Sequence, residues 1–266
     1  MARLLAISLV LTGLAVPVAR AQTPVDLELV LAVDVSLSID VAEARLQREG
    51  YIQAFRDPEV VRAIRSGILG RIAVTYVEWA GTFQRRTVVD WTLIDGEKTA
   101  DSFALALQQS APGSARRTSI SGAIDYAVPL FASNSFEGTR QVIDVSGDGP
   151  NNAGALVTRA RDRAVAAGIT VNGLPILDDG GGLYSWYNIP DLDLYYRDCV
   201  IGGPGAFLVV AENFEDFARA VRRKLILEIA RRKSRLMTAQ LRRDERVSPP
   251  CDIGERLRRA QEEDDL

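Results

Sequence analysis

The chain has no histidine and only two cysteines in 266 residues. A zinc, copper or haem centre would therefore lack most of its usual ligands. The absence of histidine also removes the commonest general base, and with it a serine or cysteine nucleophile activated by an imidazole. A site for a hard cation such as Mg²⁺, Mn²⁺ or Ca²⁺ stays open, because these ions take oxygen ligands.

The composition shows no strong bias in charge. Charged residues make up 25% of the chain, and the formal net charge is -3. This balance does not indicate nucleic-acid binding. Apolar residues make up 47%, which allows one domain with a substantial core.

The first residues are typical of an export signal. Arg3 supplies a short basic region, and the apolar stretch 4–16 is shorter than a helix that spans a bilayer. Ala19 and Ala21 fit a small-x-small cleavage site. We predict a signal peptide at residues 1–21 and an exported protein, periplasmic or secreted; the alternative is a retained membrane anchor.

Export would place the two cysteines in an oxidising compartment. Cys199 and Cys251 are therefore a candidate disulfide that would tie the C-terminal extension to the domain. The alternative is one buried thiol and one exposed thiol, because the sequence does not reveal the distance between them.

Segments typical of strands alternate with segments of helical spacing. Strands are expected at 27–33, 70–80, 84–93, 141–145, 168–177 and 206–210. This order predicts an α/β fold: a doubly wound, mostly parallel central sheet with one antiparallel edge strand and helices on both faces. In such sheets the ligand site lies beyond the carboxyl ends of the strands.

Oxygen-bearing side chains occur at that edge of the predicted sheet. Asp34, Ser36 and Ser38 alternate directly after the first predicted strand, which places them on the same side of the chain. Thr118 lies in a loop that enters a helix, and Asp148 follows the strand that ends at residue 145. The sequence therefore predicts that these residues converge.

This pattern resembles the metal-ion-dependent adhesion site of the von Willebrand factor type A family. The resemblance implies that Ser36 and Ser38 bind a cation directly, that Asp34 and Asp148 hold it mainly through water, and that Thr118 binds directly or through water. The implied cofactor is Mg²⁺, or Mn²⁺ or Ca²⁺. Neutral hydroxyl ligands leave such an ion attractive to an Asp or Glu of a partner protein.

We therefore expect an exported, cation-dependent protein-binding module that is not an enzyme and does not bind nucleic acid. Two alternatives stay open: a metal-independent envelope scaffold and a metal-assisted hydrolase. A simpler interpretation of the motif is that Asp34 and Asp148 cap helices or turns, with Ser36 and Ser38 as ordinary loop residues.

A loop with several aromatic residues is a candidate partner-binding surface. Tyr184, Trp186 and Tyr187 lie near consecutive glycines, and such residues suit binding surfaces. The alternative is that they cover the sheet, which is the role we expect of Tyr195 and Tyr196.

The C-terminal part of the chain is rich in charge. We divide the chain into the signal peptide, a von Willebrand type A domain at 22–235 and a solvated, charged extension at 236–266. The alternative is that the basic residues between 222 and 235 contact a partner or an anionic membrane surface. Asp144, which interrupts an apolar strand, is expected to accept hydrogen bonds from nearby backbone or hydroxyl groups rather than to add charge beside the cation.

Overall fold

A central sheet organises the computed structural model, which describes residues 22–177, 189–230 and 246–264. Its strand order is β4-β3-β2-β6-β7, with β3, β2, β6 and β7 parallel and β4 antiparallel to β3. This confirms the predicted fold. The strands are β2 (Leu27–Asp34), β3 (Ile72–Trp79), β4 (Arg85–Ile94), β6 (Gln141–Gly147) and β7 (Thr170–Pro175).

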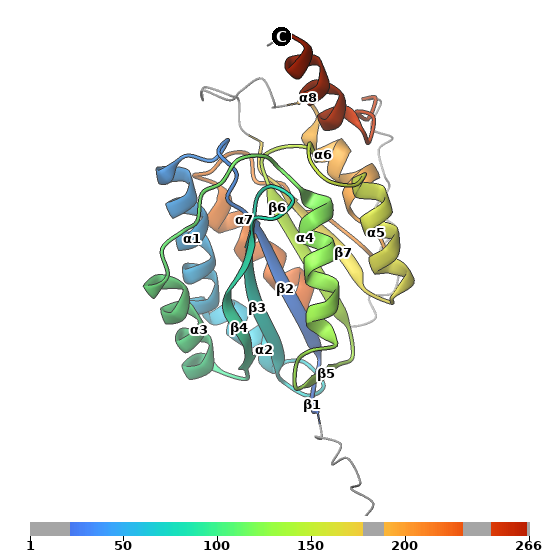
Figure 1. The fold of residues 1–266 in the computed structure, drawn as a ribbon. Helices are drawn as coiled ribbons and strands as arrows, with labels where there is room; N and C mark the ends of the chain where they lie inside the picture. Colours follow the sequence, from blue (N-terminus) through green and yellow to red (C-terminus); the bar gives the residue numbers. More distant parts are fainter. Residues whose placement is uncertain (1–21, 178–188, 231–245, 265–266) are drawn as a thin grey trace, which may run out of the picture.

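Helices cover both faces of the sheet (Figure 1). One face is covered by α1 (Val41–Arg56), α2 (Pro58–Arg65), α3 (Glu97–Gln109) and α7 (Phe217–Ile229). The other is covered by α4 (Ile120–Ala127), η1 (Val128–Phe131), α5 (Val157–Ala166), α6 (Leu192–Tyr195) and η3 (Tyr196–Val200). A small parallel sheet, β1 (Thr23–Val25) with β5 (Phe136–Gly138), and α8 (Ile253–Asp264) complete the described elements.

The strand order places a switch point at β2. The chain passes from β2 to β3 on one side and later returns to β6 on the other side. At such a point the connections leave in opposite directions and open a crevice beyond the carboxyl ends of the strands. All eight residues of β2 are buried, because helices pack on both sides of it.

One predicted strand does not form. The segment 206–210 makes one isolated bridge, between Leu208 and Gly173, instead of a sixth strand. The Phe207 amide donates to Asn172 Oδ1 at 2.9 Å, so a side chain takes a hydrogen-bond donor that a regular ladder would use.

No helix in the described ranges combines the length and apolar character needed to cross a bilayer. The predicted signal peptide, residues 1–21, lies outside those ranges.

Candidate metal centre

The end of β2 carries the first part of the candidate site. Asp34 is the last residue of β2 and is fully buried. The Ser36 amide donates a hydrogen bond of 2.8 Å to Asp34 Oδ1, which turns the chain just after the strand. The Val35 amide still pairs with Trp79 O of β3 at 2.8 Å. Both the sheet and the Asp34 carboxylate therefore hold this turn.

Hydroxyl groups join the turn to the loop after β6. Ser36 Oγ and Ser38 Oγ lie 3.0 Å apart, and Ser38 Oγ donates to Asp148 Oδ1 at 2.9 Å. Asp148 follows Gly147, the last residue of β6, and is 3% exposed. Asp34, Ser36, Ser38 and Asp148 thus form one polar cluster, although the last two are 110 positions apart in the chain.

Thr118 is brought to the same loop by main-chain contacts. Its amide donates to Asn152 Oδ1 at 2.9 Å, and its carbonyl accepts from the Asn152 amide at 2.8 Å. Arg117 has a φ of 72°, so the chain makes a left-handed turn just before Thr118. Thr118 itself is buried. The five sequence-predicted ligands therefore lie at the end of β2, in the turn after it and on two further loops, at one edge of the sheet.

Asn151 and Asn152 are structural residues whose partners the sequence did not reveal. Asn151 Oδ1 accepts from the Ser121 amide at 2.9 Å, and the Asn151 amide donates to the Tyr195 hydroxyl at 3.1 Å. Adjacent asparagines after a Gly-Pro pair are typical of a turn, but the pattern does not say which groups they bind. In the structure they connect the Asp148 loop to the start of α4 and to α6.

Two carboxylates lie close together in the cluster. Burial raises the pKa of Asp34, and the charge of Asp148 raises it further, while the hydrogen bond from Ser36 acts to lower it. Asp34 Oδ2 has no hydrogen-bond partner within the described part of the chain. A buried carboxylate oxygen without a donor is costly, and a bound cation would relieve that cost.

The donors fit a hard divalent cation. The cluster offers hydroxyls from Ser36 and Ser38 and carboxylates from Asp34 and Asp148, and Thr118 lies on the loop bonded to Asn152. Over the described ranges, no group of three or more Asp, Glu, His or Cys side chains could hold a metal. A cation bound here would therefore depend on hydroxyl oxygens, which suit Mg²⁺, Mn²⁺ or Ca²⁺ better than Zn²⁺. Water or an oxygen from outside would complete the coordination.

A buried glutamate with two arginine partners helps to fix the loop that leads to Thr118. Glu78 of β3 is 2% exposed and pairs with Arg48 of α1 and with Arg86 of β4. Glu78 Oε2 also accepts from the Gly113 amide at 3.0 Å. The loop is thus tied to the sheet before it reaches Thr118, which limits the positions that this loop can take.

Most of the chain matches one family model. Residues 24–233 match the model described as "Protein of unknown function (DUF1194)". The chain belongs to this family. A comparison of the DUF1194 chain with curated proteins gave no match.

Several solved structures are similar to the DUF1194 chain. The pilus adhesin SpaC from Lactobacillus rhamnosus GG has a TM-score of 0.56 and 12% identity, over 78% of this chain and 31% of SpaC. A von Willebrand factor type A structure from Catenulispora acidiphila has a TM-score of 0.52 and 11% identity, over 77% and 42% of the two chains. Proximal thread matrix protein 1 from the mussel byssus, "with zinc occupied MIDAS motif", has a TM-score of 0.51 and 14% identity. The match covers 80% of this chain and 47% of the mussel protein.

The DUF1194 chain spans less than half the length of each of these three proteins. At these identities the likeness concerns the fold. It establishes a von Willebrand type A-like fold for the chain.

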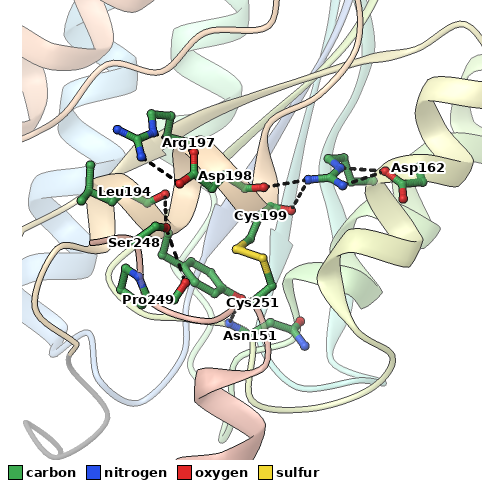
Figure 2. Close-up of a disulfide and its surroundings, with 11 residues drawn as sticks. Asn151, Asp162, Leu194, Arg197, Asp198, Cys199, Ser248, Pro249 and Cys251 are labelled. Atoms are coloured by element: carbon green, nitrogen blue, oxygen red, sulfur yellow. Dashed lines mark hydrogen bonds and ion pairs between the residues drawn. A yellow bond between two sulfur atoms is a disulfide. The ribbon is translucent and has the colours of Figure 1, made fainter. Parts of the chain in front are cut away.

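Part of the predicted C-terminal extension is not solvated. Residues 246–264 pack against the domain, where a disulfide joins Cys251 to Cys199 of η3 (Figure 2). Cys251 and Ile253 contact the core on this face of the sheet. The expectation of a solvated tail is therefore wrong for this segment, because the candidate disulfide forms and a few apolar residues pack against the core.

The helix α8 reaches two of the loops that form the site. Glu255 Oε1 accepts from Asn151 Nδ2 at 2.7 Å, and a Cβ at Gly254 would lie 2.2 Å from Asn151 O. Glu262 pairs with Arg117 at 3.3 Å. The helix therefore contacts the loop that carries Asp148 and the residue that precedes Thr118, beyond the carboxyl ends of the parallel strands (Figure 1).

Replacing Cys199 and Cys251 together with serine is expected to lower the free energy of unfolding by about 2–4 kcal/mol. The disulfide links residues 52 positions apart, so its loss frees conformations of the unfolded chain. Urea denaturation of the wild type and the double variant measures the difference. A reductant should move the wild-type midpoint to that of the variant. Equal midpoints before reduction would contradict the prediction.

Asp144 has a partner that the sequence did not indicate. The expected hydrogen bonds from nearby backbone or hydroxyl groups are not its main contact. Instead Lys224 Nζ of α7 lies 2.7 Å from Asp144 Oδ1, and both side chains are almost fully buried. The residue therefore anchors α7 to the sheet.

The tentative partner-binding residues Tyr184, Trp186 and Tyr187 lie outside the described residues. Tyr195 and Tyr196 are fully buried against the sheet, as the sequence predicted.

Proposed function

We propose that this protein is an exported module that binds a divalent cation and, through it, an acidic group of a partner protein. The observation that carries the proposal is the cluster of Ser36, Ser38 and Asp148 beside Asp34, whose buried Oδ2 has no donor in the described chain. The proposed cation is Mg²⁺, with Mn²⁺ or Ca²⁺ as alternatives.

The chemistry of the donors favours binding to an acidic partner. Ser36, Ser38 and Thr118 would contribute neutral oxygens, with Asp34 and Asp148 acting mainly through water. Such a donor set leaves much of the ion's charge uncompensated, so an outside carboxylate would complete the site. Two structural neighbours support this proposal by their descriptions: one is a pilus adhesin, and one has a zinc-occupied MIDAS motif.

We propose binding rather than catalysis for this site. The chain lacks histidine, and hydrolysis at a metal would need a base to accept the proton of the attacking water. We also propose an envelope or extracellular location. The N-terminal sequence is typical of an export signal, and the disulfide suits an oxidising compartment.

Affinity capture tests the proposal. The chain without its predicted signal peptide is immobilised and incubated with envelope extract in Mg²⁺. We expect a bound protein that EDTA elutes. A Ser36→Ala, Ser38→Ala double variant should not retain that protein, because it lacks the hydroxyl ligands.

A matched control replaces Ser66 and Ser133 with alanine; both are exposed and lie outside the cluster. This control should capture the same protein as the wild type. Retention that survives EDTA and the Ser36/Ser38 change would reject cation dependence and favour a metal-independent scaffold.

A further inference from the structure

Tyr196 is a buried tyrosine whose hydroxyl has no evident structural role. It is the first residue of η3, and it is fully buried in the core on the face that α4 and α5 cover. Its hydroxyl has no hydrogen-bond partner within the described ranges. Burying a hydroxyl without a partner costs about 1–3 kcal/mol, so the position calls for an explanation.

The Tyr196 hydroxyl lies next to the cation cluster. A Cβ placed on Gly147 would be 3.0 Å from the Tyr196 hydroxyl oxygen and 2.9 Å from Asp34 Oδ2. Two buried polar atoms that lack partners therefore flank the same glycine. One is a phenol that donates a proton, and the other is a carboxylate oxygen that accepts one.

We propose that Tyr196 is a positioning residue for the cation site. When the cation is bound, its hydroxyl would donate to Asp34 Oδ2, directly or through one water molecule, and so hold the carboxylate in the orientation that serves the cation. The inference rests on the proposed function, since it concerns the same site. It also explains Gly147, because a Cβ there would crowd both oxygens, at 2.9 Å from Asp34 Oδ2 and 3.0 Å from the Tyr196 hydroxyl.

The neighbouring tyrosine has a parallel role. The Tyr195 hydroxyl accepts a hydrogen bond from the Asn151 amide, in the loop that carries Asp148. Consecutive tyrosines thus reach the two strand ends that supply the carboxylates. Cys199, three residues after Tyr196, is joined to Cys251, so the disulfide fixes the turn that presents both rings.

Metal binding by Tyr196→Phe tests the inference. Calorimetric titration with MgCl₂ should give a dissociation constant roughly 10-fold or more above that of the wild type, the range seen when a residue that orients a metal ligand is lost. Tyr51→Phe is the matched control. Tyr51 is equally buried, but it lies in the core on the opposite face of the sheet, and it should bind Mg²⁺ like the wild type.

A spectroscopic measurement separates positioning from a merely structural effect. Addition of Mg²⁺ should change the near-ultraviolet tyrosine absorption of the wild type and of Tyr51→Phe, because the Tyr196 hydroxyl then sits against an ordered carboxylate. Tyr196→Phe should lack this change. In EDTA, its melting temperature should be at least that of the wild type, since the lost hydroxyl is buried there without a partner.

The outcomes distinguish this inference from the proposed function. A wild type that binds no Mg²⁺ overturns both. Equal Mg²⁺ affinity of wild type and Tyr196→Phe overturns only the role of Tyr196. If that variant does not fold, Gly147→Ala decides, with Gly149→Ala as control because nothing lies within 4 Å of a Cβ there. Weakened binding in Gly147→Ala alone supports the inference, and wild-type binding in both variants overturns it.

Discussion

Replacing Asp34 with asparagine is expected to weaken Mg²⁺ binding by at least about 100-fold, more than the loss of an orienting residue would. The side chain keeps its shape, and its oxygen can still accept the hydrogen bond from the Ser36 amide that turns the chain after β2. What disappears is the negative charge. The fold should therefore persist while cation binding is lost.

The same change should leave the metal-free protein at least as stable as the wild type. Burial and the charge of Asp148 both raise the pKa of Asp34, which means that its ionised form is held at a cost. A neutral amide avoids this repulsion. Sites that bind ligands often carry unfavourable charges of this kind. Removing such a charge raises stability but weakens binding.

Calorimetric titration with MgCl₂ and thermal denaturation in EDTA measure the two effects of Asp34→Asn. Asp90→Asn is the control: Asp90 is exposed on the edge strand β4, and its change should leave both quantities as in the wild type. Cation affinity that is equal in Asp34→Asn and the wild type would reject the assignment of Asp34.

Replacing Lys224 with methionine is expected to lower the free energy of unfolding by about 3–5 kcal/mol. Lys224 Nζ lies 2.7 Å from Asp144 and 3.4 Å from Glu228, and all three side chains are at most 2% exposed. Methionine fills a similar volume but leaves both carboxylates without their cation. Asn172 still donates to Glu228 at 2.7 Å, so most of the lost stability should come from the Asp144 carboxylate, which is left without its cation.

The cost of Lys224→Met should shrink as the pH falls. Burial raises the pKa of Asp144, whereas Lys224 acts to lower it, so the variant raises that pKa further above its value in the unfolded chain. Ionisation then opposes folding, and protonation of Asp144 relieves the cost as the pH falls through the raised pKa. Urea denaturation at about pH 8 and about pH 5 should show the larger deficit at the higher pH.

Lys98→Met is the matched control for this measurement. Lys98 is exposed on α3, and its replacement should change the free energy of unfolding by less than about 0.5 kcal/mol at either pH. If Lys224→Met also lowers the free energy of unfolding by less than about 0.5 kcal/mol, the buried ion pairs add little to stability.

Local patterns were enough to predict much of this fold. The apolar run of β2 marks a strand covered on both faces, and the mixture of polar and apolar residues in β4 marks an edge strand. Each signal lies within a few residues of the chain, so the sequence carries it directly.

Other features depend on how distant elements meet. Nothing near Asp144 in the sequence indicates Lys224, and nothing near Asn152 indicates that it binds Thr118. The segment 206–210 has the composition of a strand, yet Asn172 takes one of its amides. A polar side chain can bond with many groups, and only packing decides which of them it meets.

The sequence by itself determined the fold class and the set of oxygen-bearing residues at the strand ends, because periodicity and spacing are local properties. Cation binding by those residues stays a prediction. Only the tertiary structure decided that β2 lies at the switch point, that α8 contacts two of the site's loops, and that Tyr196 lies beside Asp34. These are contacts between residues far apart in the chain, and the packing of whole elements sets their distances.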